Sequence, residues 1–457
     1  MPVKRTAILC ALLTGPLTAQ AAEVTFDGYY RARARVFDTL SLDRSLSVSE
    51  GMSASMEHRV WLRPTFALND QVTTYVDLLA LDGVVWGQET VAPNAYLTGV
   101  PTFSDSLAAP LASTESGNAD ITAWRAWARV QAGNSRFHFG RMPLHWASGM
   151  WRNDGTSQQQ MLANHGDTAD RFAWEMLVEE EFFVGLAMDV KSQGYLNEKD
   201  EEIGYSGHLV FRNETTEAGF MSEYRHTASA SPNERFNLFT LDVTAGAEMG
   251  NLDVRLEAVG QFGGGALPEI GDGVSVTSFG ALLELGLISD PWIIDLDVGL
   301  ATGDEDPNDL QFKTFTFDRD YSVGLFLFEQ PMPTLAATVA SDVNGGRDQD
   351  YVATGDALAN AVFLRPQLSR KLGKGWTAEA STLFAWAAKL PESMVDQRSY
   401  GIEFGTGLTY TGIEHLEFSA RASALNPGTH YANLPNELDA SFGEMAVGAQ
   451  LGGLVRF

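Results

Sequence analysis

Polar and apolar residues alternate one by one along many segments of this chain. In residues 24–37, apolar or small side chains occupy every even position, and the odd positions include Arg31, Arg33 and Arg35. Successive side chains of a β-strand point to opposite faces, so this segment presents one apolar and one basic face. The segments run to about 10–15 residues, longer than the roughly 5–6 residues of strands in soluble sheets. Their length and alternation match tilted strands that cross a membrane.

Eighteen such segments follow one another along the chain. They lie near residues 24–37, 52–68, 72–82, 120–132, 135–144, 170–179, 182–191, 203–213, 216–226, 235–249, 251–262, 275–288, 292–302, 358–372, 375–388, 399–411, 414–425 and 439–457. Short turns between them alternate with loops, and the long loops are predicted near 83–119, 145–169 and 303–357. We therefore predict an all-β fold, a closed antiparallel transmembrane β-barrel of about 18 strands with short periplasmic turns and long extracellular loops. The sheet must close because an open edge in lipid leaves backbone groups without partners.

The first residues have the features of an export signal. Lys4 and Arg5 precede an apolar stretch at 7–17, and Ala19-Gln20-Ala21 is a small-residue cleavage pattern. We predict a signal peptide at residues 1–21 and one barrel domain at 22–457. The single cysteine, Cys10, lies in the signal, so disulfide and thiol chemistry are excluded from the barrel.

Composition excludes two other classes of protein. After residue 22 no run approaches the roughly 20 apolar residues that a membrane-spanning helix needs. The formal net charge of −28 disfavours nucleic acid as a partner, because binders of a phosphate backbone carry a basic surface. The partners expected instead are outer-membrane lipid and the barrel assembly machinery. Phe457, which ends an alternating apolar strand, resembles the signal that barrels present to that machinery.

A barrel of about 18 strands encloses a water-filled lumen, so its inward residues determine what it passes. The inward positions of the first five strands are rich in arginine. They include Arg31, Arg33, Arg35, Arg59, Arg63, Arg125, Arg129 and Arg141. Two interpretations stay open. The arginines favour the passage of anions, or they pair with carboxylates such as Glu57 and Asp77 and brace the wall.

Two tryptophans also fall on the inward parity of these strands. Trp61 and Trp127 lie among the arginines in sequence. Their rings are suited to stacking on sugar faces, and filling gaps between arginine side chains is the alternative.

Two motifs resemble known barrel families. Residues 137–155 read FHFGRMPLHWASGMWRNDG, and HGDTADR follows at 165–171. This pair is similar to an uncharacterised family of outer-membrane barrels found in myxobacteria and their relatives. ATGDEDPND at 301–309, with FTFD at 315–318, resembles the long-loop motif of alginate-export barrels. Those barrels also have eighteen strands, and their arginine-rich lumen conducts a polyuronate.

The resemblance assigns roles to particular loop residues. It implies that the first motif contributes Trp146, Asp154, Asp167, Asp170 and Arg171, and that the second contributes Asp304 and Asp306. For Arg141 it implies a position at the pore mouth, and a rim arginine tied to Asp167 or Asp170 is the alternative. It also implies an anionic polysaccharide and a periplasmic export factor as partners.

The longest loop has two features of its own. Residues 323–328 (VGLFLF) are too apolar to extend into water, so we predict that the loop folds into or over the pore. The alternative is an outward projection that binds a partner. Residues 304–309 place acidic oxygens at alternate positions, as calcium prefers, but they lack the glycine of an EF-hand loop. We predict no resident metal and no cofactor.

Enzyme chemistry has little support in the sequence. Ser206 and His208 share a face, but it is the lumenal one, and no Asp-x-His pair occurs. The expected function is an outer-membrane channel of a Gram-negative bacterium, passing anionic solutes or an anionic exopolysaccharide through its arginine-lined lumen. The alternative is a surface-anchored interaction or envelope-assembly barrel whose long loops bind a partner, with little transport.

Overall fold

A computed structural model describes most of the 457-residue chain. The described residues are 23–39, 42, 52–86, 121–156, 161–163, 166–192, 202–228, 235–267, 271–306, 309–330, 357–390, 396–432 and 442–457. The predicted signal peptide, the centre of the predicted loop 83–119 and residues 331–356 lie outside them.

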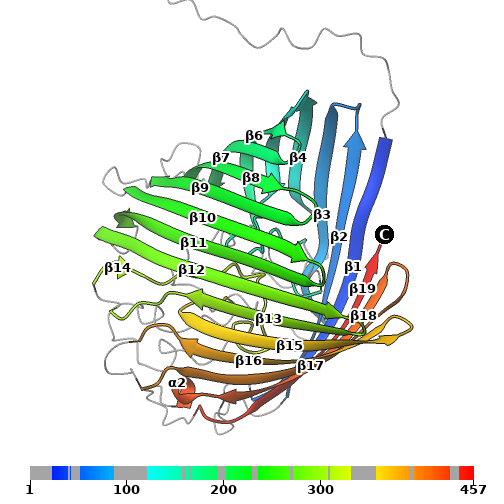
Figure 1. Ribbon diagram of the computed structural model, residues 1–457, viewed down its shortest axis with the longest axis vertical. Coiled ribbons are helices and arrows are strands. Elements are labelled where there is room, and N and C mark those ends of the chain that lie inside the picture. The colour runs from blue at the N-terminus through cyan, green and yellow to red at the C-terminus, as the bar shows by residue number, and fades with distance from the viewer. Residues whose placement is uncertain are drawn as a thin grey trace, which may run out of the picture.

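The chain forms one closed antiparallel β-barrel (Figure 1). The strands are β1 (Glu23–Asp38), β2 (Met52–Ala67), β3 (Val72–Trp86), β4 (Thr122–Ala132), β5 (Ser135–Pro143), β6 (Thr168–Glu179), β7 (Phe182–Ser192), β8 (Glu202–Arg212), β9 (Thr216–Ala228), β10 (Arg235–Met249), β11 (Leu252–Leu267), β12 (Gly271–Ser289), β13 (Trp292–Ala301), β14 (Gln311–Phe312), β15 (Ala361–Gly373), β16 (Trp376–Ala387), β17 (Ser399–Ile413), β18 (Leu416–Pro427) and β19 (Ala446–Arg456). β14 has two residues and pairs in parallel with β12, so the other eighteen of the nineteen strands form the wall. A four-residue helix, α2 (Thr429–Ala432), lies beside β17.

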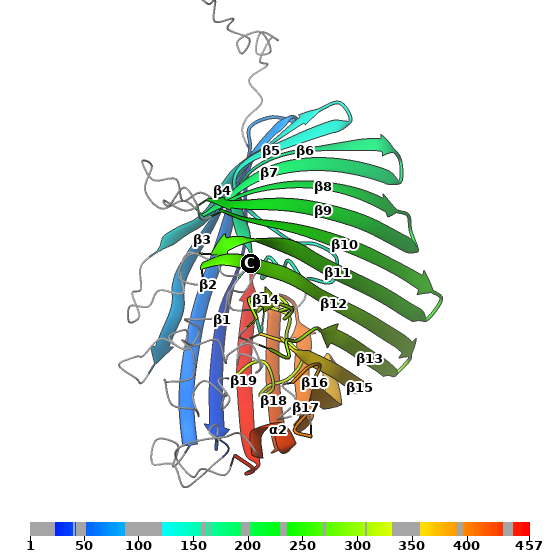
Figure 2. The same cartoon turned by 90° about the vertical axis from the view of Figure 1, so that its left-hand side faces the viewer.

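The fold confirms the predicted all-β barrel of eighteen antiparallel strands. Each predicted segment overlaps one wall strand, because strict alternation of faces is required wherever one face meets lipid and the other does not. The wall varies in height, from nine residues in β5 to nineteen in β12. Figures 1 and 2 show β5–β8 as shorter arrows than β10–β12. The loop residues 144–156, which follow β5, enter the lumen beside this low part of the wall.

The outer face carries the apolar positions of the alternation. Side chains such as Phe172, Leu186, Leu209 and Phe279 are 42–58% exposed on the outside of the barrel. In water such exposure would be unfavourable, but in a bilayer these side chains contact the acyl chains. Among the described residues, no helix is long and apolar enough to cross a membrane.

Pairing of the first and last strands closes the barrel. Arg31 is opposite Leu454 in the register of β1 with β19, and Figure 1 shows the two strands side by side. Phe457 extends the ladder, since its N–H donates to the Gly28 carbonyl (3.0 Å) and the Gly28 N–H donates to the Phe457 carbonyl (2.9 Å). The Phe457 ring lies over Gly28, where an added Cβ would come within 2.6 Å of it. Glycine at position 28 therefore lets the final residue close the seam.

One irregularity in the wall alters the lumen. The register of β3 with β4 shifts between Asp77 and Leu78, opposite Trp124. A bulge places two consecutive side chains on one face. Trp124 and Arg125 are accordingly both buried inside, with the Arg125 guanidinium 3.5 Å from the Trp124 ring centre.

Candidate functional site in the barrel lumen

The lumenal face of β1–β4 carries seven arginines. They are Arg31, Arg33, Arg35, Arg59, Arg63, Arg125 and Arg129. Glu57 accepts hydrogen bonds from Arg33, with Nη2 and Oε2 2.5 Å apart, and from Arg35. This pairing favours the bracing interpretation for part of the series. The wall nevertheless remains basic, because its seven guanidinium groups outnumber the two carboxylates, Glu57 and Asp77, with which Arg33, Arg35, Arg63 and Arg125 form ion pairs.

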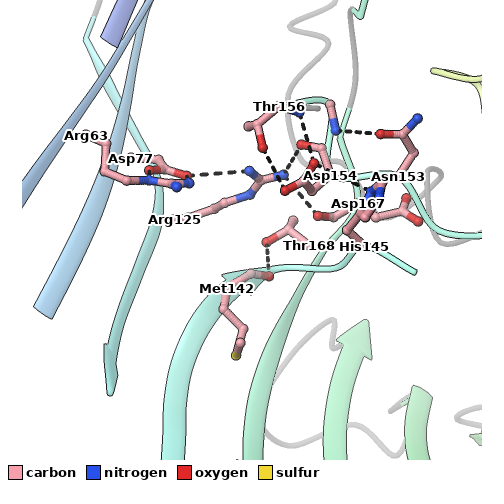
Figure 3. A network of polar contacts seen from close by, with 11 residues as sticks. Arg63, Asp77, Arg125, Met142, His145, Asn153, Asp154, Thr156, Asp167 and Thr168 are labelled. Carbon is pink, nitrogen blue, oxygen red and sulfur yellow. Dashed lines mark hydrogen bonds and ion pairs between the residues drawn. The ribbon is translucent and has the colours of Figure 1, made fainter. Parts of the chain in front are cut away.

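Asp77 is the centre of the second ion-pair group (Figure 3). Arg63 binds it through two parallel hydrogen bonds of 2.5 and 2.7 Å, and Arg125 Nη1 lies 3.5 Å from its Oδ2 atom. Arg125 also donates to the backbone carbonyls of Asp154 (2.9 Å) and Asp167 (3.0 Å). The wall arginines therefore bind the backbone of a loop as well as the wall carboxylate Asp77.

Aromatic rings enclose Arg63 on both sides. Its guanidinium lies 4.7 Å from the Trp61 ring centre and 4.9 Å from that of Trp127. Trp127 stacks on Tyr75 at 4.8 Å, and Trp61 stacks on Tyr29 at 5.6 Å. Trp61 is only 6% exposed, which favours the gap-filling alternative over sugar stacking for this ring. Trp127 is partly exposed.

The last two arginines of the predicted series differ from each other. Arg129 is partly exposed and lies over the Tyr75 ring at 5.6 Å. Arg141 is paired by the strand register with Ala126 and Asp170, which do not share the lumenal parity of Arg125 and Trp127. The register therefore gives no support to a lumenal position for Arg141. The alternation of side chains along β5 explains this, because Phe137 and Phe139 lie at the same parity as Arg141 and belong to the outer face.

Residues 144–156 turn from the low wall into the lumen and attach to carboxylates of β9 and β11. Ser148 donates its N–H (3.0 Å) and its hydroxyl to Glu257 of β11. Arg152 forms a buried ion pair with Glu223 of β9. These contacts hold the loop across the barrel against its acidic side.

The residues that the first resemblance singled out are mostly structural parts of this loop. Trp146 is buried, and Asp154 caps its own turn by accepting from Thr156. Asp167 is fully buried at the base of the loop, where its N–H donates to the Asn153 carbonyl. Arg171 instead belongs to the wall and binds Asp189 through two hydrogen bonds of 2.6 and 2.7 Å. Asp170 is exposed.

A second inward segment, residues 313–330, follows β14. Glu403 of β17 accepts from the consecutive N–H groups of residues 325–327, at 2.6, 3.2 and 2.9 Å. Arg365 of β15 donates to the Val323 carbonyl at 3.2 Å. The prediction that residues 323–328 fold into the barrel is confirmed, because these carboxylate and guanidinium groups are lumenal side chains of the wall.

The two inward segments meet inside the barrel. The Asp318 N–H donates to the Met150 carbonyl at 2.7 Å. Trp151 and Phe317 belong to the same buried apolar cluster, together with Phe326, whose ring packs edge-on against Phe37 of β1. A barrel interior with its own apolar core holds these segments in fixed positions.

The acidic loop after β13 folds on itself. The Asp304 carboxylate accepts from the N–H of Asp306 (3.1 Å) and from the N–H of Lys313 (3.2 Å), and the Lys313 ammonium lies 3.9 Å away. Within the described part of the chain, no group of three or more His, Cys, Asp or Glu side chains could hold a metal ion. The Asp304 carboxylate thus stabilises the turn of this loop, and Asp306 contributes its backbone N–H.

Glu329 makes the second inward segment sensitive to pH. Burial, and then the negative charge of Glu403, raise the pKa of Glu329 from 4.5 to about 8, although Arg33 opposes the shift. In the docked segment Glu329 is neutral at pH 7, whereas in a released segment it would be ionised. Docking is therefore most stable below pH 4.5 and loses stability as the pH rises to about 8. We expect single-channel conductance to be larger at pH 9 than at pH 5.

The matching variant is Glu329→Gln, which stays neutral at every pH. We expect it to keep the low-pH conductance at pH 9, because no buried charge forms. An equally large pH response in this variant would assign the effect to another group.

Sequence reasoning overlooked the residues that anchor the loops. Arg152, Ser148 and Glu403 make contacts between loop and wall that span 71, 109 and 78 residues of sequence, respectively. The parity of Glu403 places it in the lumen, but nothing in the sequence identifies its partner 76–78 residues away. For Arg152 the sequence did contain an indication of its role, because an arginine inside an otherwise apolar and turn-forming loop needs an anionic partner.

Comparison with known proteins rests on structure alone. No family model and no curated protein sequence matches the chain. Several solved structures do. OccK8 (OprE) of Pseudomonas aeruginosa has a TM-score of 0.51 and 10% identity, over 95% of this chain and 98% of that one. OpdQ of the same species gives 0.52 and 9%, over 95% and 97%, and a BenF-like porin from Pseudomonas fluorescens Pf-5 gives 0.53 and 8%, over 95% and 98%.

The chain has the fold of an outer-membrane porin. These similarities extend over nearly the whole length of both chains, so the porin fold describes the whole barrel and not one part of it. Together with the apolar outer belt, they place the protein in the outer membrane of a Gram-negative bacterium. At sequence identities of 8–10%, similarity to these porins indicates the fold and does not indicate which substrate this chain passes. The resemblance to alginate-export barrels and to the myxobacterial family receives no support from these comparisons.

Proposed function

We propose that this protein is an outer-membrane channel that passes anionic solutes. The excess of guanidinium groups over carboxylates on β1–β4 carries the proposal. Some of these arginines donate hydrogen bonds to backbone carbonyls, which do not neutralise their charge, so the wall keeps a positive potential. In a confined lumen such a potential concentrates anions. Catalysis has no part in this function.

Reversing charge on the accessible part of the wall tests the selectivity. Arg35 and Arg129 are partly exposed, so we expect Arg35→Glu with Arg129→Glu to lower the anion-to-cation permeability ratio about tenfold. The measurement is the reversal potential of the channel in a planar bilayer under a salt gradient. Lys374→Glu, in the exposed turn after β15, is the control with the same type of charge change. A reversal potential that stays at the wild-type value would refute anion selection by this wall.

An anionic exopolysaccharide is the larger cargo compatible with the same basic wall. A polymer would thread between the inward segments, so a soluble polyuronate should block the conductance of small ions from one side of the bilayer. A periplasmic export factor would then be a partner. The barrel assembly machinery, through Phe457, is proposed as the partner during insertion.

The second candidate function is a barrel that anchors surface loops for a partner and transports little. The apolar cluster formed by the two inward segments favours it, because packed side chains occupy space that a wide channel would leave to water. A folded, membrane-inserted protein without measurable conductance would support this candidate over the channel.

A further inference from the structure

The outer face of β15 carries one arginine among apolar side chains. Arg370 has the same outward parity as Leu368 and Leu372, which are 43% and 53% exposed. It is itself exposed and lies three residues before the end of the strand at Gly373, at the end of the barrel with the short turns. A cation on the lipid-facing side is strongly unfavourable at the bilayer midplane but tolerated near the interface. Arg370 therefore lies at the depth of the lipid headgroups.

An aromatic ring supports the Arg370 side chain. Trp292, the first residue of β13, is its register partner, and the ring centre lies 4.9 Å from the guanidinium carbon. Trp292 is 39% exposed, so the ring and the cation form one outward-facing surface. The partner on the other side is Ala378 of β16, which is too short to cover the guanidinium. The strands β13, β15 and β16 lie side by side in the sheet (Figure 1).

The described part of the wall supplies no anion to this guanidinium. None of the carboxylates that the structure describes forms an ion pair with Arg370, and Asp290, two residues before Trp292, pairs with Lys371 at 3.6 Å. A guanidinium stacked on a ring keeps its N–H donors at its edge, and a phosphate accepts two of them in parallel. At the depth of the headgroups, phospholipids present such a phosphate. Charge complementarity thus points to a lipid as the occupant.

The surface next to the cation suits an acyl chain. In the register, Ala378 and Ala380 of β16 lie between Leu368 of β15 and Leu408 of β17. The two leucines are 43% and 37% exposed, and the alanine side chains between them are shorter. A lipid with its phosphate at Arg370 can therefore pack an acyl chain against β16, between the two leucines.

We propose that Arg370 and Trp292 form a binding site for an anionic glycerophospholipid in the leaflet at the short-turn end of the barrel. The lipid phosphate accepts two hydrogen bonds from the guanidinium edge, and the Trp292 ring fixes the guanidinium in place. One acyl chain lies on the outer face of β16. The site is on the membrane side of the wall, so it is independent of what passes through the lumen. A bound lipid links the ends of β13 and β15, which the long loop separates in sequence.

Lipid binding can be measured by native mass spectrometry of the full-length barrel in detergent. The probe is 1-palmitoyl-2-oleoyl phosphatidylglycerol, titrated while the first bound lipid is counted. We expect Arg370→Gln to weaken the affinity for this lipid about tenfold, because a charge-assisted bidentate contact is lost. Trp292→Leu keeps an apolar side chain and should weaken it about threefold. 1-Palmitoyl-2-oleoylglycerol, which has no phosphate, should bind the wild type and Arg370→Gln equally weakly.

Arg235→Gln is the matched control. Arg235 is exposed and has the outward parity of Phe239, but it lies at the opposite end of the barrel, at the start of β10. It should keep the wild-type affinity, and migration of the unheated barrel on a gel shows that each variant is folded.

Three results would overturn the site. Equal phosphatidylglycerol affinity in the wild type and in Arg370→Gln would make the bound lipid adventitious. The same loss in Arg235→Gln would show that any arginine at the rim attracts the lipid. Displacement of the lipid by millimolar inorganic phosphate would assign the site to a free anion, because an acyl chain packed on β16 holds the lipid against such competition.

Discussion

Replacing Glu403 with glutamine will release residues 325–327 from the wall and raise the single-channel conductance. Three consecutive N–H groups donate to this carboxylate, and the Ser423 hydroxyl donates to it at 2.6 Å. Hydrogen bonds to a charged acceptor contribute about 1.5–3 kcal/mol each, and the amide loses the charge and one acceptor. We expect docking to weaken by about 3 kcal/mol, on the order of 100-fold in the docked-to-released ratio.

The measurement is single-channel conductance in a planar bilayer. Glu379→Gln serves as the control, because Glu379 is a partly exposed lumenal carboxylate paired with Arg421 of the neighbouring wall at 3.5 Å and contacts no loop residue that the structure describes. Wild-type conductance in a correctly folded Glu403→Gln barrel would show that this segment does not restrict the pore.

Replacing Glu223 with glutamine should cause the largest loss of stability. Glu223 is 1% exposed and pairs with three cations, Arg152 of the loop, Lys191 at 3.0 Å and Arg225 at 3.1 Å. Removing one partner from a buried ion pair costs about 3–5 kcal/mol, because the remaining charges stay desolvated. We expect a loss in this range, with loosening of the loop residues around Arg152.

The same strand offers a matched control for this variant. Glu217 of β9 pairs with Arg212 at 2.5 Å, but the two side chains are 37% and 61% exposed. Water screens that pair, so Glu217→Gln should cost less than about 0.5 kcal/mol. Denaturant unfolding of both variants in detergent would measure the difference. Equal midpoints for the two variants would contradict a structural role for the buried cluster.

The alternation of faces was enough to place every wall strand. It was also enough to put Arg31, Arg33 and Arg125 inside, because a charged side chain on the lipid face is strongly unfavourable. It misled at Arg141, which was taken as inward although its parity follows the outer phenylalanines. Trp124 lies inside because of a bulge that no pattern in the sequence marks.

The partners of the lumenal charges could not be predicted in the same way. Glu57 and Asp77 were expected opposite arginines because neighbouring strands bring them together. The contact of Arg33 with the Met161 carbonyl spans 128 residues, and that of Glu403 with Leu325 spans 78. Such contacts join the wall to a loop, and a loop has no register from which its course could be inferred.

Strand number, closure, the lipid-facing belt and the sign of the basic wall followed from the order of residues alone, because a two-residue period in a bilayer allows one kind of sheet. Which guanidinium and carboxylate groups remain available inside was decided by the tertiary structure. Two loops turn inward and use the wall charges as anchors, since polar backbone brought into the lumen must find donors and acceptors there. The hydrogen bonds from Arg31 and Arg59 to the Ala163 carbonyl follow from this inward course of the loop, and the alternating pattern does not predict them.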